Sequence, residues 1–276
     1  MAELDATTGP AAGDADPLRL VGADRVLAVL LELGAHPGGA SLDTIAAAVG
    51  SPKPTVHRAL AALRRAGLAV QRDRGVYLIG DDFLRIAFQH AAERPDGARI
   101  APALEALASA FGETAHYAVL EGTDVVYRAK TDPEREAVRL SSVVGGRNPA
   151  ARTAVGKLLL STRVPDEASL RRMLGDGPLP AATPSTITDV GELWAELERT
   201  RERGYAVDDQ ENEVGVNCVA VPVDVDPHRP GGGAVSVSAL AFRTPLSALV
   251  AAIPRIHEIL DDALGDRGTS RSHAHR

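Results

Sequence analysis

The sequence predicts an α+β protein in which a small helical domain precedes a larger domain built on an antiparallel sheet. Two patterns support this fold class. Three short helical stripes of apolar residues and one alternating segment occupy residues 18–80. From about residue 97 to residue 265, strand-like alternating segments are mixed with helical ones. The length of 276 residues is also what two domains of ordinary size need.

Composition excludes several classes of protein. Hydrophobic residues make up 45% and charged residues 24% of the chain, as in a globular protein. The single cysteine excludes an intrachain disulfide and indicates a reducing compartment. No apolar run approaches the roughly 18 residues of a membrane span, and the acidic N-terminus lacks the order of a secretion signal. We expect a cytoplasmic protein without a cofactor, and no metal site, because His273 and His275 lie in a predicted disordered tail at 266–276.

The first domain follows another predicted disordered tail at 1–17, which is rich in Ala, Gly, Asp and Pro. Its first two apolar stripes end at Gly34 and Gly50, and glycine is typical of a helix end. A third helix has Pro54 in its first turn, where the missing N–H costs nothing. Residues 68–80 then alternate around a charged turn, which predicts a two-stranded hairpin. Three helices and a hairpin in this order indicate a winged helix-turn-helix.

Positive charge is concentrated in this domain, although the whole chain has a net charge of −7. Residues 51–76 hold six lysines and arginines against one aspartate. A solvated helix face is the ordinary explanation of such a run, but clustered cations also bind DNA phosphates by releasing counterions. The third helix favours DNA, because its basic side lies opposite its apolar stripe and includes the N-terminal residues that read bases. We expect contacts to double-stranded DNA from Lys53, Pro54, Thr55, His57, Arg58, Arg65, Arg72 and Arg74.

A linker helix is predicted over residues 81–96, with Asp81 or Asp82 as its cap. Its apolar stripe is too short and isolated to form the core of a domain. We expect the stripe to be buried against the same helix of a second subunit, and packing on its own domain is the alternative. The stripe consists of Leu84, Ala87, Phe88 and Ala91.

The second domain extends over residues 97–265. Its first helix ends at Gly112, and a hairpin that turns at Glu121 and Gly122 follows. Pro254 is expected to interrupt the last helix. Further strands are predicted at 137–144, 205–209, 216–225 and 234–242, and further helices at 154–161, 166–174, 189–204 and 247–264.

The order of elements over residues 18–265 resembles the IclR family of bacterial transcriptional regulators. The segment at 41–80 looks like the winged helix of that family. More specific matches are TAVGK at 153–157, GYAVDDQENEVGVNCVAVPV at 204–223 and SVS at 236–238. The resemblance implies a GAF-like α/β second domain that binds an effector, joined through the linker helix to the winged helix. It also implies dimers or tetramers on palindromic operators.

The resemblance implies a set of residues that line the effector pocket. Ala154 and Val155 open a helix, whose free N–H groups favour a carboxylate. Ser236 and Ser238 share one strand face, from which their hydroxyls can donate hydrogen bonds. A small organic acid is therefore the expected effector. The alternative to a binding role is that the two serines face solvent and that Asp208 is a turn residue. The implied set is Ala154, Val155, Asp208, Val216, Cys218, Ser236 and Ser238.

The chain departs from the family pattern at two places. Pro54 stands where the family usually has serine, so one contact to DNA is missing from the pattern. Ala239 and Leu240 follow SVS where Gly-Pro is frequent, which leaves the shape of the pocket and the class of the effector open.

The predicted function is ligand-responsive repression or activation of a metabolic, and specifically catabolic, operon. The second hypothesis is an enzyme with Cys218 as its nucleophile and Asp208 and a histidine beside it. Only His116 is expected to enter the interior of that domain, and no histidine forms a recognisable motif with Cys218. The third hypothesis is a winged helix for protein contacts, but its concentrated positive charge fits a polyanion better. The effector, the operator and the choice between dimer and tetramer stay open.

Overall fold

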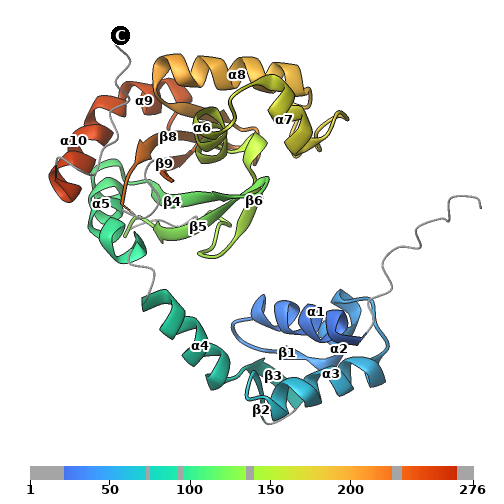
Figure 1. The fold of residues 1–276 in the computed structure, drawn as a ribbon. Helices are drawn as coiled ribbons and strands as arrows, with labels where there is room; N and C mark the ends of the chain where they lie inside the picture. The colour runs from blue at the N-terminus through green and yellow to red at the C-terminus, as the bar shows by residue number, and fades with distance from the viewer. Residues whose placement is uncertain (1–21, 73–74, 93–95, 135–139, 226–231, 266–276) are drawn as a thin grey trace, which may run out of the picture. The chain divides into compact units, whose positions relative to one another are not determined.

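The computed structural model forms two compact units that divide near residue 93. Predictions for the two tails, for Arg74 and for the two C-terminal histidines concern residues that the structure does not describe. The described residues are 22–72, 75–92, 96–134, 140–225 and 232–265 (Figure 1).

Over its described residues, the first unit contains four helices and a small sheet with the strand order β1-β3-β2 (Figure 1). The predicted winged helix-turn-helix is confirmed. The hairpin gains a third strand, because Ala40 and Ser41 pair with Tyr77 and Val76. The elements are α1 Gly22–Gly34, β1 Ala40–Ser41, α2 Leu42–Ala48, α3 Lys53–Arg65, β2 Ala69–Arg72, β3 Val76–Ile79 and α4 Asp81–Ala92.

Local sequence explains where α2 and α3 begin. The Ser41 hydroxyl accepts the N–H of Thr44 at 3.1 Å, which caps α2. Pro54 occupies the first turn of α3 as expected. The apolar stripe of α3 packs on α1 and α2, and it consists of the buried Val56, Ala59, Leu60 and Leu63.

Helix α4 confirms the helix predicted after Asp81. Every side chain described in it, from Asp81 to His90, is exposed, including Phe88 with 70% of its surface. The described part of the chain therefore does not bury the stripe on its own domain. Burial against a second subunit stays a prediction.

The second unit is a six-stranded antiparallel sheet with helices on both faces, and the α+β fold class is confirmed. The strands follow the order β6-β5-β4-β9-β8-β7 across the sheet. The elements in chain order are α5 Asp96–Phe111, β4 Thr114–Glu121, β5 Asp124–Thr131, β6 Arg147–Pro149, a 3₁₀ turn Ala150–Arg152, α6 Ala154–Arg163, α7 Glu167–Leu174, α8 Val190–Arg203, β7 Ala206–Asp209, β8 Val216–Val223, β9 Gly233–Leu240, α9 Leu246–Ala251 and α10 Ile253–Leu264.

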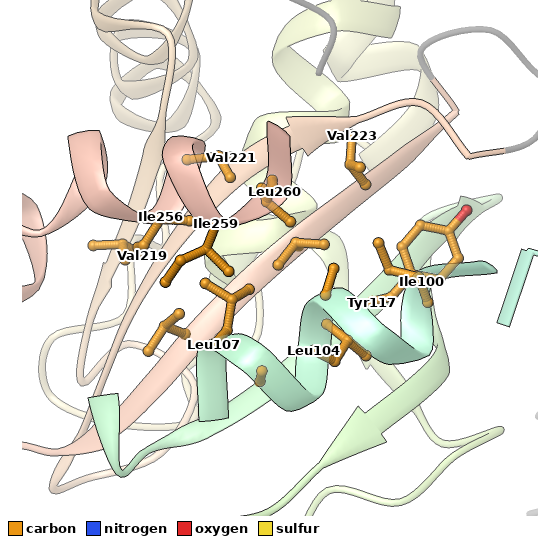
Figure 2. Packing of buried hydrophobic residues seen from close by; sticks show 14 of the residues in the cluster. Ile100, Leu104, Leu107, Tyr117, Val219, Val221, Val223, Ile256, Ile259 and Leu260 are labelled. Carbon is orange, nitrogen blue, oxygen red and sulfur yellow. The ribbon is translucent and has the colours of Figure 1, made fainter. Parts of the chain in front are cut away.

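Two hydrophobic cores lie on the two faces of this sheet. Figure 2 shows the first, in which Leu104 of α5 and Ile256 of α10 pack against Tyr117 of β4 and Val219 of β8. The second core lies between the opposite face and helices α6 and α8. Neighbouring residues of β4 therefore belong to different cores, as Tyr117 and Ala118 do.

Two sequence signals at helix ends in this unit are confirmed. The Asp189 carboxylate accepts the N–H of Glu192 at 2.9 Å and caps α8. Pro254 interrupts the last helix, which divides at Ala252 into α9 and α10.

The strand predicted at 137–144 is wrong over its described part. Residues 140–144 form no strand, and the edge strand β6 begins only after Gly146. The Lys130 ammonium donates to the carbonyl oxygens of Leu140 and Ser142, at 3.1 and 2.9 Å. These carbonyl groups are thereby directed to a side chain instead of a strand ladder.

Gly156 lets the start of α6 approach the backbone closely. A Cβ atom added there would lie 2.2 Å from the carbonyl oxygen of Ala150. We expect Gly156→Ala to lower the free energy of unfolding by about 1–3 kcal/mol, although alanine is the better helix former. Gly97→Ala in α5 is the control, because its Cβ would lie 3.6 Å from the nearest atom. Urea titrations in which both variants match the unmodified protein would contradict this account.

Candidate functional site

The basic surface of the first unit lies on α3 and on the hairpin. Arg64 of α3 donates to the Gln71 side chain of β2 at 2.7 Å, which ties the helix to the hairpin. Lys53 pairs with Asp43 of α2 at 2.9 Å, and both side chains are more than half exposed. Thr55 is half-buried, whereas the other described residues of the predicted DNA surface are exposed, namely Lys53, Pro54, His57, Arg58, Arg65 and Arg72.

The second unit contains a cavity whose floor crosses the whole sheet. Each of the six strands contributes at least one side chain to it. Asp208 of β7 is paired in register with Cys218 of β8, and Cys218 with Ser238 of β9. On β4, His116 is paired with Ser236 of β9. Strands β5 and β6 complete the row with Tyr127 and Asn148.

The cavity is covered by the start of α6 and by two loop segments. Ala154 and Val155 of α6 line it, together with residues 140–142 and 212–213. Its volume is about 50 Å³. Hydrogen bonds hold the cover in place, because Ser142 is bonded to His116 at 2.7 Å and Ser141 donates to Glu213 at 3.2 Å. The space inside is small.

All seven residues of the predicted effector set line this one cavity. They come from α6, β7, β8 and β9, so the fold brings together segments that lie more than 80 residues apart in the chain. Other lining residues were not singled out from the sequence, among them Tyr127, Leu140, Ser142, Asn148, Thr153 and Asn212. Of the histidines, only His116 was expected to enter the interior of this domain. Its side chain is buried there, with 2% of the residue's surface exposed.

The start of α6 offers backbone donors to the cavity. The Thr153 hydroxyl caps the helix by accepting the N–H of Gly156 at 3.1 Å. The N–H groups of Ala154 and Val155 belong to the first turn, where a helix provides no internal acceptor. Such groups, together with the helix dipole, attract an anion.

Burial changes the protonation of the side chains around the cavity. Burial and the nearby Lys130 lower the pKa of His116 to about 3, so the ring is neutral. Burial raises the pKa of Asp208 to about 7, although Lys157 and the N–H of Glu211 oppose the shift. Burial also raises the pKa of Tyr127 to about 12.

The Cys218 thiol also lines the cavity. Burial and the negative charge of Asp208 raise its pKa well above the ordinary value. A nucleophilic cysteine needs the opposite shift, because the thiolate is the reactive form. The environment of Cys218 is therefore that of an inert wall residue and disfavours the catalytic hypothesis.

A buried ion pair holds the wall of the cavity. Lys157 of α6 pairs with Glu211, and their side chains are 1% and 8% exposed. The Asp208 carboxylate accepts the N–H groups of Glu211 and Asn212, at 2.7 and 3.3 Å. These contacts fix the turn after β7 against the helix that provides the backbone donors.

Two family models cover most of the chain. One is described as the C-terminal domain of the bacterial transcriptional regulator IclR and matches residues 97–262, and the other, the IclR helix-turn-helix domain, matches residues 22–73. The chain belongs to the IclR family. The DNA-binding transcriptional repressor YiaJ of Escherichia coli K12 is 32% identical to it over 216 residues, which are 78% of this chain and 76% of that protein.

Solved structures agree with the IclR fold. The crystal structure of Thermotoga maritima IclR has a TM-score of 0.66 and 27% identity, and covers 87% of this chain and 97% of its own. An IclR homologue from Microbacterium hydrocarbonoxydans, complexed with 4-hydroxybenzoate, has a TM-score of 0.69 at 20% identity. That alignment covers 87% of this chain and 98% of the homologue, and it concerns the fold alone. This IclR-family chain is thus a DNA-binding transcriptional regulator by descent.

Within the described ranges, no helix combines the length and the apolar composition that crossing a membrane requires. In the same part of the chain, no cluster of three or more His, Cys, Asp or Glu side chains is arranged to hold a metal ion.

Proposed function

We propose that this IclR-family protein is a cytoplasmic, homo-oligomeric regulator that a small carboxylate controls. It binds operator DNA through α3 and the hairpin, and the acid binds in the cavity of the second unit. By this binding it represses or activates a metabolic, catabolic operon. The observation that carries the proposal is the convergence of all seven predicted effector residues on one cavity.

The exposed side of α3 supports the DNA contact. The residues at its N-terminal end, including Thr55, His57 and Arg58, are in the position from which a recognition helix reads base edges. Arg65 and Arg72 are exposed cations beside them and suit phosphate groups. Pro54 is exposed in the same turn but has no side-chain donor, so it contributes only an apolar contact.

The exposed apolar side chains of α4 support assembly into a dimer. Phe83, Leu84 and Ile86 expose 38%, 43% and 44% of their surface, and Phe88 exposes 70%. Pairing of α4 with its copy removes this apolar surface from water. Two-fold symmetry then presents two α3 helices to two half-sites of a palindromic operator. A ligand that alters the second unit changes the geometry of the two paired α4 helices, and thereby the affinity for the operator.

Arg58→Ala tests the DNA-binding proposal. We expect a loss of about 1–3 kcal/mol in binding to the operator, because one bidentate contact to a base contributes that much. Fluorescence anisotropy with the promoter upstream of the gene and with a scrambled duplex measures the loss on each. An equal loss on both duplexes would reduce Arg58 to a phosphate contact.

The matched control for this experiment is Arg172→Ala. Arg172 is an exposed arginine of α7 in the second unit, where it donates to Ser169. Its replacement should leave operator affinity unchanged. A steep loss of binding with added salt is also expected, since released counterions drive the association. If the intact oligomer ignores the promoter at low salt, the proposed function is wrong.

A further inference from the structure

Part of the cavity lining is held by side chains and has no strand ladder or helix of its own. Residues 140–142 line the cavity but belong to no helix or strand, and we call them the cover segment. Most of the other lining residues belong to strands or to α6, whose backbone groups are bonded within the sheet or the helix. Local opening takes place where few backbone hydrogen bonds must break. The cover segment is therefore the part of the lining that opens at least cost.

The Lys130 ammonium is the main anchor of the cover segment. It donates to the carbonyl oxygens of Leu140 and Ser142, at 3.1 and 2.9 Å, and it pairs with the Asp132 carboxylate at 3.1 Å. An ammonium group has three donors, which these three acceptors match. The Lys130 side chain is only 11% exposed, so water competes little for the same acceptors. Hydrogen bonds with a charged partner are also stronger than those between neutral groups.

Asp132 and Thr114 fix the position of this ammonium. The Thr114 hydroxyl of β4 donates to the Asp132 carboxylate at 3.1 Å, and Thr114 is 1% exposed. Lys130 itself is not among the described residues that line the cavity. It therefore acts on the cavity through the cover segment and does not touch a ligand there.

The remaining anchors of the cover segment are weaker. His116 of β4 is paired in register with Lys130, and its Nε2 atom is bonded to the Ser142 hydroxyl at 2.7 Å. The ring is neutral, so no charge strengthens this bond. Ser141 donates to Glu213 at 3.2 Å, but this contact is exposed to water. Among the described residues, the cover segment thus depends most on Lys130.

We propose that Lys130 is a positioning residue that holds the cover segment over the cavity, and that its release sets the rate at which the regulator exchanges its ligand. This inference rests on the proposed function, because the cavity is the proposed effector site. A water needs about 10–15 Å³ of such space, so about 50 Å³ holds roughly three to five waters, and a larger molecule enters only when the lining moves. Since Lys130 lies outside that space, its contacts form with or without a ligand. Their release therefore limits the rates of binding and dissociation and leaves the equilibrium affinity nearly unchanged.

Cys218 reports the opening of the cover segment without any ligand. It is the single cysteine of the chain, and it lines the cavity. The aromatic disulfide dithiobis(nitrobenzoate) reacts with a thiolate by disulfide exchange, which releases one coloured thionitrobenzoate ion for each thiol. The reagent carries a pair of aromatic rings, and benzene alone occupies a cavity of about 150 Å³. It therefore reaches Cys218 only after the lining has moved.

Lys130→Met tests the assignment in the full-length protein at a mildly alkaline pH. We expect Cys218 to react at least about tenfold faster than in the unmodified protein, because loss of hydrogen bonds to a charged group shifts the opening equilibrium by that factor. The reaction rate of each unfolded protein in concentrated urea is the reference. The acceleration should change little in low concentrations of urea, since local opening exposes little surface.

Arg128→Met is the matched control. Arg128 lies on the same strand as Lys130, its side chain is 13% exposed, and it pairs with Glu121 instead of the cover segment. Its replacement should leave the reaction rate of Cys218 unchanged. Should Lys130→Met fail to fold, Lys130→Gln takes its place. The glutamine amide can donate to one carbonyl group but carries no charge, so we expect an acceleration of about fivefold.

The outcomes separate this inference from the function on which it rests. An unchanged reaction rate of Cys218 in Lys130→Met, or in Lys130→Gln in its place, overturns the role of Lys130. Equal acceleration by Arg128→Met, or a steep rise of the rate with urea, means a general loss of stability and overturns it as well. None of these measurements involves an acid or DNA. Operator binding by the same preparations therefore tests the proposed regulator independently.

Discussion

Replacement of Lys157 by methionine is expected to lower the free energy of unfolding of the second unit by about 3–5 kcal/mol. The Lys157 side chain is 1% exposed and pairs with Glu211. Methionine has a side chain of similar length but carries no charge. The buried carboxylate of Glu211 therefore loses its charged partner. Its Oε2 atom already has no hydrogen-bond partner among the described residues. Urea-induced unfolding followed by circular dichroism measures the loss.

The double variant Lys157→Met with Glu211→Leu is the control for this prediction. It removes both charges, and replacing a whole buried pair by apolar groups is often neutral or stabilising. The backbone carbonyl of Glu211, which accepts from the Thr186 hydroxyl at 2.6 Å, is retained. We expect the double variant to recover most of the lost stability. A single variant as stable as the unmodified protein, or a double variant as unstable as the single one, would contradict the account.

Sequence patterns predicted those helices and helix ends that are determined by residues close together in the chain. The stripe from Val56 to Leu63 identifies α3 because a helix returns to the same face every three or four residues. Asp189 and Pro254 mark the start and the break of two other helices by direct effects on backbone groups. The order of strands across the sheet, in contrast, was not predicted from periodicity.

The errors in the predicted secondary structure concern segments whose structure depends on residues far away in the sequence. Strand β1 has two residues, too few for an alternating pattern, and exists because β3 provides its partner. The segment at 140–144 was predicted as part of a strand, but Lys130 of β5 engages the carbonyl groups of Leu140 and Ser142. A pattern of polar and apolar residues carries no information about such a partner.

The cavity was predicted in part, and by resemblance more than by pattern. Ser236 and Ser238 share a strand face by simple alternation, yet β9 is buried on both sides, so alternation does not tell which face lines a cavity. The same holds for His116 on β4, where every residue but the last is buried. The neutral state of His116 depends on burial, which only the folded sheet reveals.

Two groups of opposite effect are expected to shape the dependence of stability on pH. His116 has a pKa of about 3 in the folded protein, so only the unfolded chain binds its proton between about pH 3 and 6.5, and stability rises with pH there. Asp208 has a pKa of about 7, so only the folded protein holds its proton between about pH 4 and 7, and stability falls with pH there. Between about pH 4 and 6.5 the two slopes cancel.

Each single variant removes one of the two compensating groups, His116 or Asp208. It should therefore reveal the pH dependence of stability that the other group causes. His116→Asn leaves the slope of Asp208, so its stability relative to the unmodified protein should fall by about 1.4 kcal/mol per pH unit from pH 4 to 6.5. Asp208→Asn leaves the slope of His116, and its relative stability should rise at the same rate. Urea titrations at several pH values measure these differences, in which the groups common to both proteins cancel. Parallel curves for the variants and the unmodified protein would mean that neither side chain changes its proton affinity on folding, and that the cavity is open to water in solution.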